Sequence, residues 1–169
     1  NIYQMIQLYK PNSRNEGCAF GFREGVNNDR DAEPCVYVTA IKQFSWNSKT
    51  RNGSFSENKD NPDKKIQIKL NEVELGGFIA AVDRYQDFSA FHSYEDTKTS
   101  ITFKTYSKKG GEQAFSLTLT RNSAEKFGLG VEMGEAYLMA EYFRYILRKL
   151  FHQRAVKQEE YRKKPTTDE

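Results

Sequence analysis

The 169-residue sequence has few cysteines and no long apolar run. Its two cysteines, Cys18 and Cys35, lie in strand-like stretches without CxxC spacing and without a nearby pair of histidines, which argues against a zinc site. They could form one disulfide, but two small buried thiols in a reducing compartment are the commoner arrangement. No apolar stretch approaches the roughly 18 residues that a membrane-spanning helix needs. We therefore expect a soluble globular domain with no membrane partner.

The standard catalytic motifs are also missing. The sequence contains no Walker loop, GxGxxG, HExxH or GxSxG pattern. The only histidines are His92 and His152, and neither has a serine, cysteine or paired carboxylate partner in a motif. We therefore expect no enzymatic activity, no metal site and no cofactor. His92 is expected to form a hydrogen bond within or beside a sheet.

A net charge of +3 conceals alternating basic and acidic blocks. Residues 35–70 carry seven lysines and arginines against three acids, and residues 98–126 carry six against two, so each block has a charge of +4. Between them, residues 71–97 carry six acids and one base. The basic blocks coincide with strand-like sequence rich in aromatic residues, a composition typical of surfaces that bind single-stranded nucleic acid. The alternative is that these lysines are only the solvated face of antiparallel strands.

Alternation of apolar and polar residues with a period of two recurs along the chain and predicts half-buried strands. The third and fourth predicted strands are separated by the polar stretch 45–63. This stretch is predicted to be a long loop or an extended hairpin tip, and it holds the only tryptophan, Trp46. The predicted strands cover residues 2–9, 18–23, 35–44, 64–70, 88–94, 98–106, 113–121 and 126–131.

Helical periodicity follows each set of four strands. Asn71 is predicted to cap a helix of about four turns, with Glu74 placed three residues later as in a capping box. A second helix is predicted from near Met133 to at least Phe151, with a broad apolar stripe for burial. Residues 154–169 have few apolar side chains and are predicted to form a frayed or flexible charged tail.

An internal repeat relates the two halves of the chain. A shift of 61 residues aligns the strand and helix that start at Lys65 with those that start at Lys126, so that Glu74 meets Glu135. Each unit is too small to bury its own sheet and helix well, so the two should pack together. The predicted fold is α+β, with antiparallel sheets packed with two helices. The predicted organisation is a single domain at 1–153, with ββββα repeats at about 1–86 and 87–153.

Five fragments carry a resemblance to a known superfamily: GCAFGF at 17, QFSW at 43, KKIQIKLNEVELGGFIAAV at 64, FHSYEDTKTSITF at 91 and VEMGEAYLMAEYFRYIL at 131. With the order of strands and helices, they make residues 1–151 resemble the superfamily of the transcriptional coactivator positive cofactor 4, the plant Whirly proteins and certain mitochondrial guide-RNA-binding proteins. The pattern favours a bacterial or phage-type member. The plant lysine motif K-G-K-A-A-L is missing, because the corresponding strand reads EGCAF from Glu16.

The resemblance implies binding of single-stranded DNA or RNA without enzymatic activity, by a sheet whose aromatic residues stack on bases and whose basic residues meet phosphates. It also implies association, because members with one ββββα unit are dimers and Whirly proteins with two units are tetramers. We therefore expect a homodimer or a higher homo-oligomer. We expect an intracellular location in the cytoplasm or nucleoid, or in an organelle, because the chain begins at Asn1 rather than at a methionine.

Strand alternation selects the candidate binding residues. On the strand at 98–106, Ile101 and Phe103 share one face, and the other face is polar. Basic and hydroxyl side chains on such a face can contact phosphates, and aromatic side chains can stack on bases. The predicted nucleic-acid-binding residues are Lys42, Phe44, Trp46, Lys49, Arg51, Lys65, Lys69, Thr102, Lys104, Tyr106, Lys108, Thr118, Thr120 and Arg121. Further stacking candidates, of which the last two fit the core equally well, are Tyr37, Phe22 and Phe91.

The sequence therefore predicts a single-stranded DNA-binding protein of low sequence specificity that acts in replication, recombination, repair or transcription. A role in transcription would be similar to that of a coactivator. One alternative is an RNA-binding or annealing protein of the same fold, since no residue marks recognition of a 2′-hydroxyl. The other alternative is a protein-interaction scaffold that does not bind nucleic acid, because the long, aromatic-rich second helix permits assembly.

Overall fold

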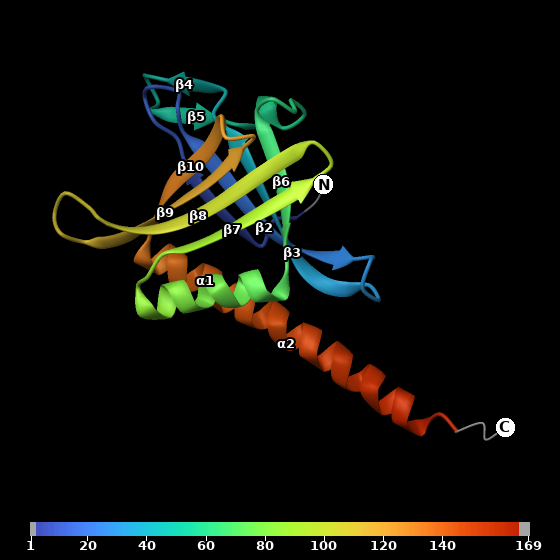
Figure 1. Ribbon diagram of the computed structural model, residues 1–169. Helices are drawn as coiled ribbons and strands as arrows, with labels where there is room; N and C mark the ends of the chain where they lie inside the picture. The colour runs from blue at the N-terminus through green and yellow to red at the C-terminus, as the bar shows by residue number, and fades with distance from the viewer. Residues whose placement is uncertain (1–2, 166–169) are drawn as a thin grey trace.

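Two four-stranded antiparallel sheets stand above two helices (Figure 1). The computed structural model describes residues 3–165. Sheet 1 has the strand order β1-β2-β3-β6 and consists of β1 (Ile6–Lys10), β2 (Cys18–Asn27), β3 (Glu33–Lys42) and β6 (Lys65–Leu70). Sheet 2 has the order β10-β9-β8-β7 and consists of β7 (Phe88–Tyr94), β8 (Thr97–Ser107), β9 (Gln113–Arg121) and β10 (Glu125–Glu132).

One helix follows each sheet, so the predicted α+β fold is confirmed. Helix α1 (Glu72–Arg84) follows β6, and helix α2 (Met133–Lys163) follows β10. The stretch predicted as a loop or hairpin tip holds a ribbon of β4 (Ser45–Asn47) and β5 (Asn52–Ser54), followed by the 3-10 turn η1 (Ser56–Asn58). This ribbon lies at the end of the molecule away from the helices (Figure 1). No helix within residues 3–165 is both long enough and apolar enough to span a membrane.

The internal repeat is visible at the two helix starts. Helices α1 and α2 begin at residues 61 positions apart, and both first turns are closed by capping boxes. In α1, the Asn71 side chain accepts a hydrogen bond from the backbone N–H of Glu74, and the Glu74 carboxylate accepts one from the N–H of Asn71. Glu132 and Glu135 form the equivalent pair in α2. Because such a box satisfies N–H groups that the helix leaves unpaired, it sets the switch from strand to helix in both repeats.

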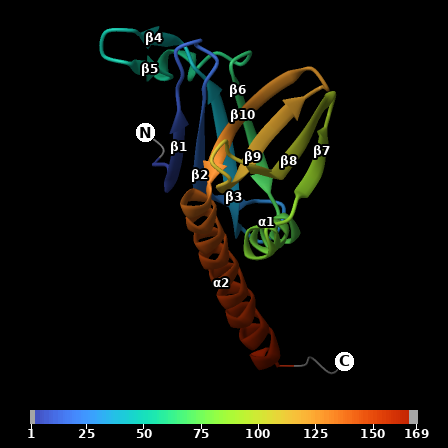
Figure 2. The same ribbon diagram turned by 90° about the vertical axis from the view of Figure 1, so that its left-hand side faces the viewer.

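The two sheets face each other above the helices (Figure 2). A continuous hydrophobic core lies between their inner faces and reaches both helices. Phe78 of α1 is its centre, because the ring lies 5.2 Å from that of Phe103 on β8 and 5.5 Å from that of Phe143 on α2, between centroids. Phe143 also meets Phe22 of β2, at 5.9 Å. Phe22 is therefore a core residue and not a stacking platform, which settles one of the two open assignments.

Both cysteines are free and buried, as the commoner of the two alternatives predicted. They sit at opposite ends of the β2–β3 hairpin, where Cys18 faces Lys42 and Cys35 faces Gly25 across the register. Burial raises the pKa of the Cys18 thiol to about 12 and raises that of Cys35 as well. Because the thiolate is the reactive form, burial makes both side chains unreactive packing residues.

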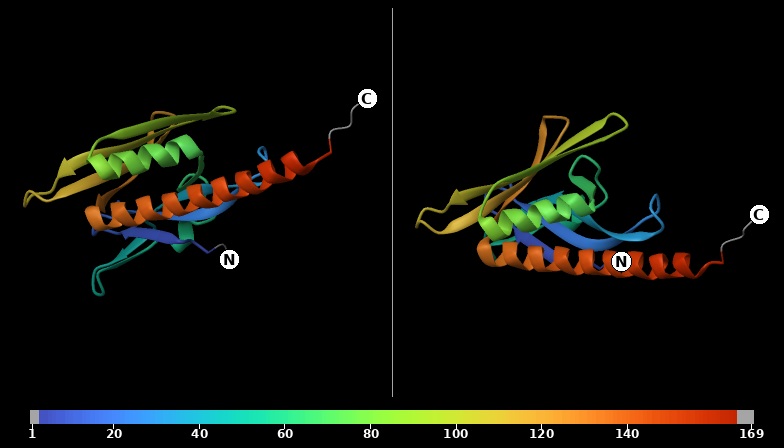
Figure 3. Two further views of the ribbon diagram at one scale, coloured as in Figure 1. Left: turned by 90° about the horizontal axis from the view of Figure 1, so that it is seen from below. Right: turned by 60° about the horizontal axis from the view of Figure 1, so that its bottom comes forward.

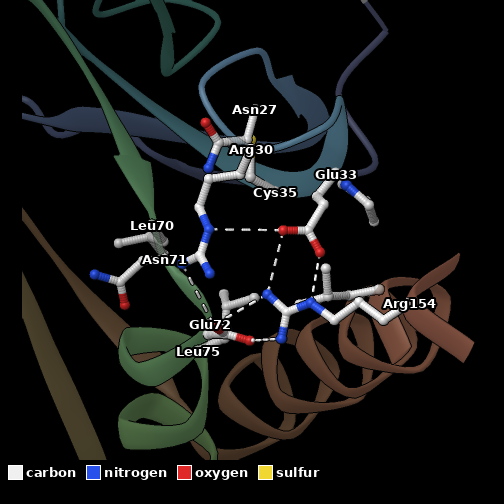
Figure 4. A pocket seen from close by; sticks show the side chains of 11 residues that line it. Asn27, Arg30, Glu33, Cys35, Leu70, Asn71, Glu72, Leu75 and Arg154 are labelled. Atoms are coloured by element: carbon white, nitrogen blue, oxygen red, sulfur yellow. Dashed lines mark hydrogen bonds and ion pairs between the residues drawn. The ribbon is translucent and has the colours of Figure 1, made fainter. Parts of the chain in front are cut away.

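The predicted frayed tail is wrong for residues 154–163, which continue α2 as a regular helix. Figure 3 shows this helix running beside α1 and then well beyond it. The Arg154 guanidinium holds it in place by hydrogen bonds to the carboxylates of both Glu33 and Glu72 (Figure 4). Lys149 adds an ion pair to Glu24 of β2, at 2.7 Å. Residues 166–169, also assigned to the tail, lie outside the described part of the chain, as does Ile2 of the first predicted strand.

Candidate nucleic-acid interface

Small hydroxyl side chains cover the outer face of sheet 2. The strand register sets Ser100 beside Thr120, Thr102 beside Thr118, and Lys104 beside Ser116. These side chains point away from the core, because their neighbours in sequence, such as Leu117 and Leu119, are buried. We call this surface the hydroxyl face; it carries six of the predicted binding residues, namely Thr102, Lys104, Tyr106, Lys108, Thr118 and Thr120.

The charges on the hydroxyl face are positive. The outward positions of β7 to β10 include Lys98, Lys104 and Lys126, all exposed, and none of the ion pairs formed within residues 3–165 involves them. The one carboxylate at such a position is Glu132, at the end of β10, where it pairs with Lys108 at 3.0 Å. That pairing lowers the pKa of Glu132 and raises that of Lys108. Lys108 thus sits on the predicted face, but its charge is already compensated.

Two aromatic side chains are exposed on the same face. Phe91 of β7 is 63% exposed, so of its two predicted alternatives it is a surface residue and not a core residue. Tyr106 of β8 is also exposed, and its hydroxyl would lie 2.9 Å from a Cβ atom at position 130. The ring therefore reaches across β9 to β10, and Gly130 leaves the space that this position needs. Both rings are available for stacking.

Several acidic residues around the helices are compensated by basic side chains. Asp83 of α1 pairs with Arg144 of α2 at 2.6 Å, and Glu135 pairs with Lys10 at 2.8 Å. Glu74, inside its capping box, also binds His92 of β7, which is the hydrogen bond beside the sheet that the sequence predicted. All three acidic residues of α1 are thus bound to basic side chains, whereas the lysines of the hydroxyl face named above form no ion pair within the described residues.

The remaining predicted residues fall in three other places. Lys65 and Lys69 point outward from β6 on sheet 1, with Tyr37 of β3 directly opposite Lys69. The ribbon beyond sheet 1 carries the others, with Phe44, Lys49 and Arg51 exposed and Trp46 half-buried. The predicted residues therefore do not form one patch. In Figure 2, sheet 1 and the β4–β5 ribbon lie on one side of the molecule and β7 to β9 of sheet 2 lie on the other. The predicted residues on sheet 1 and on or beside the ribbon are Phe44, Trp46, Lys49, Arg51, Lys65 and Lys69.

Lys42 and Arg121 do not lie on either outer face. Arg121 lies on the same face of β9 as the buried leucines. Its guanidinium donates hydrogen bonds to the carbonyls of Pro62 and Lys65, both at 3.1 Å, and forms an ion pair with Glu125. The Lys42 ammonium lies 4.9 Å from the centre of the Phe127 ring. Both cations therefore join the two sheets at their inner edge, where structural bonds occupy them.

No metal centre is apparent in the described residues, since nowhere between residues 3 and 165 do three histidine, cysteine, aspartate or glutamate side chains gather. The candidate site is a surface of cations, hydroxyls and aromatic rings. Such a surface can hold a phosphate chain and stack bases.

The arrangement of two antiparallel sheets over two helices has a counterpart among solved structures. No family model and no curated protein matches the sequence. The crystal structure of WHY1 from Arabidopsis thaliana is similar, with a TM-score of 0.61 over 100% of this chain and 98% of that chain, at 12% sequence identity. At this identity the likeness establishes the fold, which is Whirly-like.

Proposed function

We propose that this chain binds single-stranded DNA with low sequence specificity and acts without catalysis, in replication, recombination, repair or transcription. The observation that carries the proposal is the hydroxyl face, where exposed lysines and hydroxyls occur without an uncompensated carboxylate. Lysine and hydroxyl contacts to phosphate oxygens position a strand but read no sequence. Low specificity follows from this chemistry.

The exposed aromatic residues favour a single strand over a duplex. Phe91 and Tyr106 can stack only on bases that are unpaired and accessible, and such stacking contributes roughly 1 to 3 kcal/mol per base. In a duplex the bases stack on one another, so only the phosphate contacts would remain. The Whirly-like fold supports the proposal, because the superfamily that the sequence resembles is one of single-strand binders.

Titration of a labelled oligonucleotide tests the function. We expect the protein to bind a single strand about tenfold or more tightly than the matching duplex at moderate salt. Affinity should fall with salt, with a log-log slope of about −0.7 for each phosphate contact. Fluorescence anisotropy at two salt concentrations measures both, and an RNA strand of the same sequence shows which nucleic acid is preferred. Equal affinity for strand and duplex, or affinity that salt does not change, would refute the proposal.

We also propose that copies of the chain associate through α2. Its outward side carries large apolar side chains of which half or more of the surface is exposed, and patches of this kind are typical of protein interfaces. Light scattering should give a solution mass of a dimer or a higher oligomer, and Leu138→Glu should reduce it to that of a monomer because a carboxylate would be buried in the contact. A monomeric wild type would contradict this. The exposed apolar side chains on the outward side of α2 are Tyr137, Leu138, Tyr145 and Phe151.

A further inference from the structure

One side of the β7 backbone has no partner strand. β7 is the last strand of sheet 2, and within the described residues it pairs with β8 alone. Figure 2 shows it as the outermost strand of that sheet. An edge strand presents N–H and C=O groups with which another strand can pair. The free edge of β7 is therefore a candidate contact surface.

The register identifies the residues whose backbone groups point outward from this edge. Along a strand, these groups alternate between its two sides. The N–H of Asn122, just after β9, donates to the carbonyl of Lys98 at 2.7 Å, so the even-numbered residues of β8 face β9 and the odd-numbered ones face β7. Their partners on β7 have even numbers, since Phe88 lies opposite Phe103. The odd-numbered residues of β7 therefore direct their N–H and C=O groups away from β8: Ser89, Phe91 and Ser93.

These outward groups are accessible and unprotected. All three residues are exposed, and their backbone groups form no hydrogen bond to any turn or loop of residues 3–165. Edge strands are commonly protected from pairing by lysine or proline. Each of the other three edge strands carries a lysine: Lys10 on β1, Lys65 on β6 and Lys126 on β10. β7 reads FSAFHSY and has no lysine, arginine, acidic residue or proline.

Charges of opposite sign flank the two ends of β7. Beside its start, two cations exceed one carboxylate: Arg84, Lys104 and Asp87. Beside its end, in the hairpin to β8, two carboxylates exceed one cation: Glu95, Asp96 and Lys98. An identical strand in antiparallel orientation sets its end beside the start of the first, so the opposite charges meet. A second copy of the chain is therefore the partner that this edge fits.

We propose that two copies of the chain pair β7 with β7 in antiparallel orientation about a twofold axis, so that sheet 2 continues from one copy into the other. The outward N–H and C=O groups of Ser89, Phe91 and Ser93 then pair with those of the partner strand. Side chains stand perpendicular to the sheet, so Phe91 remains on the hydroxyl face, and the hydroxyl faces of the two copies become one surface. The contact does not require nucleic acid.

This pairing acts together with the association through α2 proposed above. One strand edge buries little surface, so the β7 contact is weak by itself. Two copies joined through α2 present two such edges, and two of these pairs can use both edges at once, which raises the effective concentration of one edge for the other. We therefore expect Leu138→Glu, which lacks the α2 contact, to be monomeric at micromolar concentration although its β7 is unchanged.

Hydrogen exchange of the full chain, without nucleic acid, is the direct test. In the wild-type oligomer the N–H groups of Ser89, Phe91 and Ser93 should exchange about tenfold or more slowly than in Leu138→Glu at the same concentration, because pairing protects them. Burial of α2 alone leaves these groups unpaired, so the measurement separates the two contacts. Equal exchange in oligomer and monomer would overturn the inference and leave the edge open to a strand of another protein. A wild type that stays monomeric up to about 1 mM would overturn it as well.

Two substitutions at Ser93 supply the second arm of the experiment. Ser93→Pro removes one outward N–H and leaves the hydrogen bonds to β8 intact, whereas Ser93→Ala keeps that N–H and is the matched control. In sedimentation experiments, Ser93→Pro should associate about tenfold or more weakly than the wild type, and Ser93→Ala should associate equally well. Equal association of the two variants would refute the contact, whereas failure to bind DNA would refute only the proposed function.

Thermal unfolding shows whether both variants are folded. If Ser93→Pro does not fold, the double variant Ser89→Lys, Ser93→Lys replaces it. Its lysines bring like charges together across the proposed contact, as lysine does on protected sheet edges, so we expect the same loss of association. Association equal to that of the wild type in the folded double variant would refute the β7 contact.

Discussion

Replacing Phe143 by alanine should lower the free energy of unfolding by about 3 to 5 kcal/mol. The side chain is fully buried, and its ring joins α2 to both α1 and β2 through contacts with Phe78 and Phe22. Its loss would remove apolar burial and leave a cavity where the helices meet the sheets. Neighbouring aromatic rings cannot collapse into that space without leaving their own positions.

Urea denaturation followed by circular dichroism measures this change. Tyr161→Ala is the control, because Tyr161 is an aromatic residue of the same helix but is 78% exposed. That variant should lie within about 0.5 kcal/mol of the wild type. A loss of similar size in the two variants would mean that the core that joins the repeats does not dominate stability.

Local signals in the sequence were sufficient to predict the two repeats. The change from period two to helical period falls at Asn71 and again at Glu132, and at each point a carboxylate three residues later completes the capping box. Such motifs act within one turn of chain, so sequence reasoning can find them. Because both switches are local and lie 61 residues apart, the order ββββα-ββββα was predictable.

The extension of α2 was not predictable, because distant residues stabilise it. Residues 154–163 lack an apolar stripe, and their helical state depends on Arg154, whose carboxylate partners Glu33 and Glu72 lie more than 80 positions away in the sequence. Composition alone cannot pair them. The prediction of Arg121 as a binding residue was wrong for a different reason. Arg121 lies two positions after Leu119 and therefore on the inner face of the strand, whereas Thr120 lies on the outer face. Stricter use of the alternation would have assigned the two residues to different faces.

The outer face of sheet 1 contains a groove that is lined by residues such as Tyr9, Thr39 and Lys65, and the sequence did not predict it. Its floor depends on small side chains in adjacent strands, and their alignment becomes known only from the register. One signal was present: Gly21 and Gly25 recur on the same face of a single strand, and glycine inside a strand often marks the close approach of another group. In the structure, Gln4 covers the first and Tyr37 covers the second.

Neutralising the lysines of the hydroxyl face should have the largest effect on binding. In the triple variant Lys98→Gln, Lys104→Gln, Lys126→Gln, affinity for single-stranded DNA should fall about 100-fold at low salt. The three ammonium groups project from strands whose outward neighbours are hydroxyls and glycines, so nothing on that face can replace them. If each contacts one phosphate, the magnitude of the log-log salt slope should decrease by about 2.

A second triple variant separates the position of the charges from their number. Arg162→Gln, Lys163→Gln and Lys164→Gln remove the same charge from the C-terminal end of α2, away from both sheets. If the hydroxyl face holds the phosphates, this variant keeps most of its affinity and its salt slope. If both variants lose affinity alike, the strand responds to net charge and not to a defined surface. The log-log salt slope is a more decisive measurement than the affinity at one salt concentration. Loss of phosphate contacts changes this slope, whereas substitutions on a surface that does not contact the strand leave it unaltered.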